Sequence, residues 1–155
     1  MFVKRPGLSD TIQDLGRMGF LKYAVPKSGF MDAQAAKRAN NILGNDPNDA
    51  VLEMSIRGGS YRFDLHTFIC VSGAQMNFTL NGKYQESDSL ISIKPRDEIE
   101  FSQAMDGVYT YLAVKGGFKS SIRMGSRSMH SSLFGVSRLK EGDVIEYLRT
   151  EAAPN

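Results

Sequence analysis

The sequence has few of the residues that cross-link a chain, anchor it in a membrane or charge it strongly. Its 155 residues include one cysteine, Cys70, which excludes an internal disulfide and fits a reducing compartment. No run approaches the ~20 apolar residues of a membrane helix, and the first residues lack an apolar signal core. A net charge of +2 favours neither nucleic acid nor an anionic membrane as partner. We therefore expect a cytoplasmic protein.

Histidine is also scarce, and this bears on metal binding and catalysis. His66 and His130 are far apart and lack cysteine or carboxylate neighbours at ligand spacing, so no metal site is expected. Cys70 lies in an apolar stretch, which predicts a buried, unreactive thiol. Ser128 and His130 are two residues apart, and nearness in sequence does not establish a catalytic triad.

The chain length fits one domain, which we expect to span residues 1–149, followed by a tail over residues 150–155. One helix is predicted after Asp32, a good N-cap, with Gly44 placed to end it. Apolar residues at helical spacing lie between them, and they are Ala35, Ala36, Ala39, Ile42 and Leu43.

After Pro47 the hydrophobic period changes to two, which predicts short strands. The expected strands cover residues 51–56, 61–64, 67–72, 76–80, 90–93, 98–101, 108–115 and 144–148. Asn81-Gly82 predicts a hairpin turn. Residues 1–30 are rich in turns, and residues 119–135 predict a long loop of the kind that is often functional. The fold class is therefore all-β, a barrel or sandwich with one short helix.

Two stretches of the chain echo one another. Residues 93–101 and 139–147 share the order apolar residue, lysine, two variable residues, aspartate, one variable residue, isoleucine, glutamate and aromatic residue. A turn followed by the start of a strand explains this similarity, so we interpret the two stretches as similar corners rather than as an internal repeat.

Glycine, carboxylate, amide and arginine residues crowd into the first third of the chain. Gly16, Gly29 and Gly44 suggest turns or close backbone approach. Such turns could direct nearby polar groups at one ligand, namely Asp14, Arg17, Asp32 and Asn40. The alternative is that these residues serve the turns alone, because aspartate, asparagine and glycine favour turns for local reasons.

Three further sets of polar residues allow two interpretations each. Arg17 and Asp32 could form a structural salt bridge instead of a ligand site. Glu53 either faces outward, which the alternation favours, or is buried and paired with a basic side chain. Arg127, in Gly125-Ser126-Arg127-Ser128, either binds a carboxylate or phosphate bidentately or lies on a flexible loop.

Short motifs follow one another in a fixed order along nearly the whole chain. The first ones are Pro6-Gly7, Thr11-Ile12-Gln13-Asp14-Leu15-Gly16-Arg17, Val25-Pro26-Lys27-Ser28-Gly29, Met31-Asp32, Ala39-Asn40, Leu43-Gly44-Asn45 and Leu52-Glu53. Later ones are Gly73-Ala74, Tyr111-Leu112-Ala113-Val114-Lys115-Gly116-Gly117, Gly125-Ser126-Arg127-Ser128, and Leu139 with Gly142-Asp143. This order resembles the biotin-dependent carboxyltransferase A/B family, also called allophanate hydrolase subunit 2, which includes the C component of bacterial 5-oxoprolinase and the KipA proteins.

The resemblance implies a cyclophilin-like β-barrel and a function carried out with other polypeptides. The implied partner is a C/D-type protein (KipI-like, the B component of 5-oxoprolinase), joined by an ATPase subunit or a biotin carboxylase. Such assemblies transfer a carboxyl group from carboxybiotin to urea, or open 5-oxoproline with ATP. ATP or carboxybiotin would come only through partner subunits, with no cofactor bound covalently to this chain.

The resemblance also implies roles for individual residues. Arg17, Asp32 and Glu53 would be catalytic. Arg17 would hold a carboxylate, as would Arg127, while Asp32 and Glu53 would orient amide or imide groups or position the arginines. The other residues implied to bind substrate are Gln13, Asp14, Gly16, Ser28, Gly29, Asn40, Gly125, Ser126 and Arg127. No metal ligand is implied.

Several features keep a second function open. Members of the family are longer and carry a second barrel-like half, so this chain resembles the first half only. Ala24, Phe30 and Gly58-Gly59-Ser60 depart from the family pattern. The alternative is a non-catalytic, KipA-like regulatory module that antagonises an inhibitor of a histidine kinase. Two further alternatives are that the chain self-associates and so rebuilds a two-barrel unit, and that the chain is a fragment of a longer protein.

Overall fold

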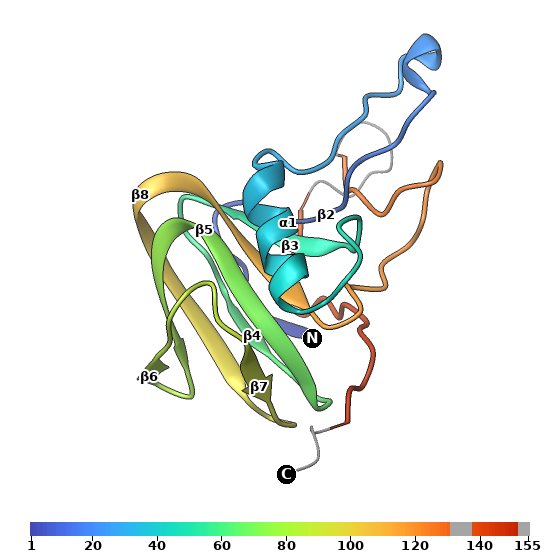
Figure 1. Ribbon diagram of the computed structural model, residues 1–155. Coiled ribbons are helices and arrows are strands. Elements are labelled where there is room, and N and C mark those ends of the chain that lie inside the picture. Colours follow the sequence, from blue (N-terminus) through green and yellow to red (C-terminus); the bar gives the residue numbers. More distant parts are fainter. Residues whose placement is uncertain (131–137, 152–155) are drawn as a thin grey trace.

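The computed structural model describes residues 1–130 and 138–151, where eight strands form one curled sheet (Figure 1). Strands β1 (Phe2–Arg5), β4 (Ser60–Arg62), β8 (Glu98–Val114), β3 (Val51–Ser55) and β2 (Asp10–Gln13) follow one another across it. The long strand β5 (Thr67–Leu80) pairs with β8 and with the short strands β6 (Lys83–Tyr84) and β7 (Ile91–Ile93). This arrangement confirms the all-β, barrel-like fold.

Helix α1 (Ala33–Ile42) covers the outer face of this sheet. The Asp32 carboxylate caps it by accepting a hydrogen bond from the Ala35 N–H at 3.2 Å, and Gly44 follows the last turn with φ of +66°. Buried alanines pack against Val51, Cys70 and Tyr111 of the sheet. The caps and the apolar spacing therefore predicted this helix correctly. The predicted burial of Cys70 is also confirmed.

The opposite face of the sheet encloses the main hydrophobic core. Along β8, Leu112 and Val114 point into that core, while Tyr111 and Ala113 point toward α1. The sheet is therefore buried on both sides where the helix crosses it, and the hydrophobic period of two is confirmed in this strand. At the far end, Asn81 and Gly82 have positive φ and join β5 to β6, as their sequence predicts.

Some predicted element boundaries were wrong. The predicted strands 67–72 and 76–80 are parts of one continuous strand, β5, and the predicted strands 98–101 and 108–115 are parts of another, β8, which ends at Val114. Register shifts near Gly73 let the two strands bend without breaking their pairing. The turn-rich first 30 residues also contain β1 and β2, which the sequence did not predict, and the short 3-10 helix η1 (Leu21–Tyr23).

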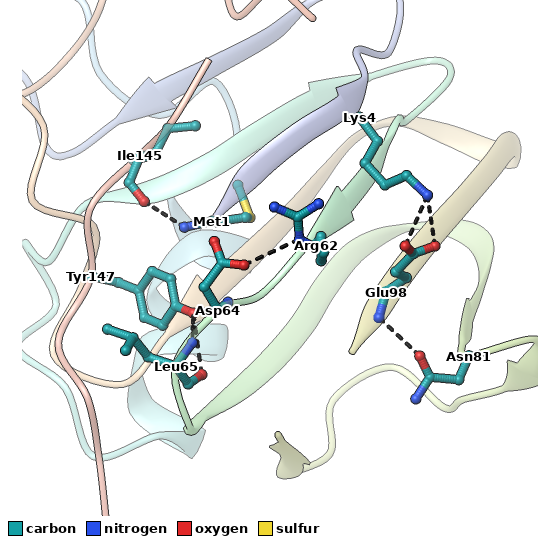
Figure 2. A network of polar contacts seen from close by, with 9 residues as sticks. All are labelled: Met1, Lys4, Arg62, Asp64, Leu65, Asn81, Glu98, Ile145 and Tyr147. Carbon is teal, nitrogen blue, oxygen red and sulfur yellow. Dashed lines mark hydrogen bonds and ion pairs between the residues drawn. The ribbon is translucent and has the colours of Figure 1, made fainter. Parts of the chain in front are cut away.

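The sequence predicts a strand over residues 144–148, but these residues, which the structure describes, form none. The segment is instead hydrogen-bonded to the start of the chain. Figure 2 shows the Met1 amino group donating to the Ile145 carbonyl at 2.7 Å, and the Tyr147 hydroxyl contacting the backbone of Asp64 and Leu65. Isolated bridges pair Phe2 with Val144 and Phe118 with Tyr147. The segment therefore adds an edge to the sheet without becoming a regular strand.

The two echoing stretches form matching turns. The Asp97 carboxylate accepts from the Lys94 N–H at 2.8 Å, and the Asp143 carboxylate accepts from the Lys140 N–H at 2.8 Å. This confirms two similar corners. Thr150 is hydrogen-bonded to His66, whereas residues 152–155 of the expected tail and residues 131–135 of the expected loop lie outside the described residues. No helix in the described part is long and apolar enough to cross a membrane.

Candidate functional site

Asp14 is the centre of a buried network just after β2. Its carboxylate accepts hydrogen bonds from the N–H groups of Gly16 and Arg127, both at 2.8 Å. The hydroxyls of Ser126 and Ser128 donate to the same carboxylate. The side chain is buried, and these four donors satisfy its oxygens. Asp14 therefore fixes the loop 119–130 against the start of the chain.

Arg17 is buried in the same region and holds three segments together. Its guanidinium donates to the Ser128 carbonyl at 2.7 Å, the Ser28 hydroxyl at 3.1 Å and the Arg123 carbonyl at 3.3 Å. Burial lowers the pKa of Arg17, and the Asp14 charge opposes that shift. The alternative salt bridge between Arg17 and Asp32, two described residues, does not form, because the Asp32 carboxylate caps α1 instead.

The glycines of this region let two backbone segments approach closely. Gly16 has φ of +90° and Gly29 has φ of +100°. A Cβ atom on Gly16 would lie 2.5 Å from the Lys27 carbonyl oxygen, and one on Gly29 would lie 2.8 Å from that of Leu15. Both glycines therefore serve contact between residues 14–17 and 27–30. Gln13 adds to this contact by accepting from the Gly29 N–H at 3.1 Å.

Glu53 lies on β3 and is buried toward α1, so the favoured outward orientation was wrong. Its carboxylate accepts from the Tyr111 hydroxyl at 2.7 Å and from the Met31 N–H at 2.9 Å. Its partners are thus a phenol and a backbone amide rather than the basic side chain of the alternative interpretation. Burial raises the pKa of Glu53, and these two hydrogen bonds offset part of that rise.

The backbone of residues 29–32 connects the Asp14 network with Glu53. Successive N–H groups bind the Gln13 side chain, the Asp14 carbonyl, the Glu53 carboxylate and the Tyr111 hydroxyl. The Asp32 N–H donates to that hydroxyl at 2.7 Å. This segment therefore links most of the residues singled out from the sequence into one continuous network.

Asn40 stands apart from this network. It lies on α1, where its amide donates to the Asp49 carbonyl at 2.9 Å and accepts from Asn45 at 3.0 Å. Asn45 in turn donates to the Val114 carbonyl at 2.8 Å. The contacts of Asn40 therefore hold the end of the helix against β8.

Two open hollows lie on either side of the loop 119–130. The smaller, of about 310 Å³, is lined by Asp14, Gly125 and Ser126 together with Asp46, Asn48 and Asp49. The larger, of about 450 Å³, is lined by Ser120, Arg123 and Ser128 and, across from them, by Asp143 and Glu146. Lys119 and Arg127 line both hollows, so a ligand in either one would meet two cations.

Arg127 differs from Arg17 in its exposure to these hollows. It is half-buried, its Nη1 atom donates to the Ser120 carbonyl, and its backbone N–H donates to Asp14. A guanidinium held in this way is oriented in advance for a carboxylate. Of the two predicted arginines, Arg127 lines the hollows, whereas Arg17 does not and instead binds the carbonyls of the loop.

The sequence did not predict the contributions of Lys119 and Tyr111. Tyr111 belongs to the site because it pairs with Glu53 across neighbouring strands, a register that only the folded sheet defines. Lys119 follows Gly116-Gly117, and no spacing rule marked it. Among the described residues, no group of three or more histidine, cysteine, aspartate or glutamate side chains gathers as a metal site. Cys70 lies in the helix-side layer, and burial raises the pKa of its thiol to about 11.

Comparison with known proteins places this geometry in a family context. Residues 23–155 match the family model described as carboxyltransferase domain, subdomain A and B. The chain is 33% identical to urea amidolyase from Lachancea kluyveri, over 97% of this chain and 8% of that protein. It is 29% identical to the C component of 5-oxoprolinase from Escherichia coli, over 90% of this chain and 46% of the relative.

Solved structures agree with these matches. The urea amidolyase of Kluyveromyces lactis superimposes with a TM-score of 0.89 and 32% identity, over 93% of this chain and 9% of that one. The urea carboxylase of the same yeast gives a TM-score of 0.89 and 32% identity, over 92% of this chain and 13% of that one. The chain therefore spans less than half of the 5-oxoprolinase relative and a small part of the yeast enzymes.

Proposed function

Because the chain belongs to the carboxyltransferase domain family, subdomain A and B, we propose that it is one part of an assembly that acts on amides or cyclic amides. The assembly is of the 5-oxoprolinase or urea-carboxylating type, and its other polypeptides include a C/D-type, KipI-like protein. The relatives named as a 5-oxoprolinase component and as urea amidolyase support this proposal. The chain alone is expected to be inactive.

The observation that carries the proposal is the position of Lys119 and Arg127 beside both hollows. Substrates of these reactions carry a carboxylate or develop negative charge on oxygen, and fixed cations and N–H donors stabilise such charge. We assign substrate-carboxylate binding to Arg127. Arg17 and Asp14 hold the loop that presents Arg127, and Glu53 holds residues 29–32 through the Met31 N–H.

The roles of ATP and carboxybiotin belong to the other polypeptides in this proposal. In the urea-type reaction, Lys119 and Arg127 would hold the carboxylate that carboxybiotin, bound by a partner, would supply. The chain's own contribution is to bind and orient a carboxylate next to Lys119 and Arg127.

The test is Arg127→Ala in an assembly reconstituted with the C/D-type protein and the ATPase subunit of the same organism. We expect 5-oxoproline-dependent ATP turnover to fall at least about 100-fold in kcat/KM, as for loss of a preorganised charge partner. Arg38→Ala is the control, because Arg38 is exposed on α1 and forms only a surface ion pair of 3.9 Å. Equal turnover in the two variants would refute the role of Arg127.

A further inference from the structure

Two loops project side by side from the same end of the sheet (Figure 1). We call residues 17–27, which carry η1 at their tip, the first arm, and residues 119–130 the second arm. The Arg17 N–H donates to the Lys27 carbonyl at 2.8 Å and closes the first arm at its base. The Arg17 side chain then joins the arms through the carbonyls of Arg123 and Ser128. The arms are therefore positioned relative to one another by a buried cation.

Both arms expose large apolar side chains away from the core. On the first arm Leu21 is 79% exposed, and Met18 and Tyr23 are 65% and 66% exposed. On the second arm Ile122 is 61% exposed and Met124 is 46% exposed. Single exposed apolar residues are common on proteins, but a group of them on two joined projections marks an interaction surface.

The arms are also uniformly basic. No aspartate or glutamate occurs between Asp14 and Asp32, or between Asp106 and Glu141, although acids are nearly as numerous as bases in the whole chain. The basic residues of the arms are Arg17, Lys22, Lys27, Lys119, Arg123 and Arg127. A surface of this kind is complementary to an acidic surface that carries apolar pockets.

We propose that the two arms form the docking surface for an acidic, apolar-pocketed face of the C/D-type protein. The inference rests on the proposed function for the identity of this partner. A protein is favoured over a membrane because the chain spans 46% of a relative whose own name makes it one of several subunits. Docking there would close the hollows beside Lys119 and Arg127, which belong to the second arm.

The test measures binding of the full 155-residue chain to the purified C/D-type protein of the same organism by titration calorimetry. Leu21→Glu should weaken binding at least about tenfold, and Tyr84→Glu is its matched control because both side chains are 79% exposed. Lys22→Glu with Lys27→Glu should weaken binding similarly, against Lys83→Glu with Lys94→Glu, which are also exposed. Wild-type affinity should fall between about 50 and about 300 mM NaCl, because salt screens the attraction.

Each other outcome has a distinct meaning. Tight binding that the arm variants leave unchanged overturns the docking surface and leaves the proposed function standing. If the wild-type chain does not bind the C/D-type protein, the docking surface is refuted, and turnover in the reconstituted assembly then decides the proposed function separately. Arm-dependent binding to phosphatidylserine vesicles, without binding to the protein, would replace the docking proposal with a membrane surface.

Discussion

At the scale of single residues, Glu53 shows why alternation along a strand can mislead. All of the first four residues of β3 are buried, because the core covers one face and α1 with residues 29–32 covers the other. Neither face of β3 is therefore exposed to solvent over these four residues. The partner Tyr111 lies 58 residues away, so no local signal could reveal it. The Asp14 network was easier to anticipate, since its glycines and carboxylate are close together in sequence.

The raised pKa of Glu53 gives a pH-dependent prediction. The folded state binds the proton of Glu53 more tightly than the unfolded state does. The contribution of Glu53 to folding stability is therefore fullest below the unfolded pKa of about 4.3, and it is lost as pH rises through the pKa of the folded state. In Glu53→Gln the amide oxygen can accept from the Met31 N–H and the Tyr111 hydroxyl. We expect the variant to gain stability relative to wild type between about pH 4 and pH 7.

Urea unfolding at these two pH values measures the change, with exposed Glu86→Gln as the control. A stability difference for Glu53→Gln that is the same at both values would contradict the assignment of the pH dependence to this carboxyl group.

The two arginines should respond differently to truncation. Arg17→Ala removes three hydrogen bonds and leaves two carbonyls and a hydroxyl without that donor, so it should cost about 2–4 kcal/mol in the free energy of unfolding. Arg127→Ala should cost less than about 1.5 kcal/mol, since it keeps the backbone N–H that binds Asp14 and loses one side-chain hydrogen bond, to the Ser120 carbonyl. Denaturant titration of both variants provides the comparison, and a larger loss for Arg127→Ala would reverse the roles assigned here.

At the scale of elements, the helix was the most predictable part of the fold and the long strands the least. Asp32 and Gly44 mark the ends of α1 by local chemistry that needs no tertiary contact. The strands β5 and β8 instead continue through Gly73 and Gly107, where glycine adopts positive φ inside a bent, shifted pairing. Glycine in a strand pattern predicts either a turn or a bulge, and only pairing between distant residues selects the bulge.

The alanine face of α1 predicts a tight fit against the sheet. Ala36 is fully buried in a cluster with Val51, Cys70 and Tyr111. Ala36→Leu would add volume to this closely packed layer and should cost about 1–3 kcal/mol, despite the good helix propensity of leucine. Thermal or urea unfolding measures the cost, with exposed Lys37→Leu as the control. Equal stability of the two variants would mean that the layer between α1 and the sheet accommodates a leucine side chain without strain.

At the scale of the whole molecule, the chain folds its last described segment back against its first residues. Met1 and Ile145 exchange hydrogen bonds, and Tyr147 secures the turn at Asp64 and Leu65 (Figure 2). Figure 1 shows the two arms at the other end of the sheet. The Asp14 network and the smaller hollow adjoin the second arm, whereas the larger hollow reaches residues 143–146 of the last described segment. Lys119 and Arg127 of the second arm therefore line both hollows, and the larger hollow lies beside the segment that binds the start of the chain.

The fold-level prediction succeeded where it rested on period and turn chemistry, together with the resemblance carried by ordered motifs. It could not place the arms, because Arg17 joins them through carbonyls that lie 106 and 111 residues away in sequence. For the same reason, only the folded chain distinguishes Arg17, which supports the loop, from Arg127, which lines the hollows and is proposed to bind the ligand.

The most direct test of the central claim is reconstitution with the C/D-type protein and the ATPase subunit of the same organism, with and without this chain. The measured quantity is ATP hydrolysis dependent on 5-oxoproline, with urea-dependent carboxylation by the biotin-containing partner measured in parallel. We predict that one of the two activities requires the chain and is lost when it is omitted. If both activities are absent or proceed unchanged without the chain, while it remains folded, the account of this protein as a working part of such an assembly is wrong.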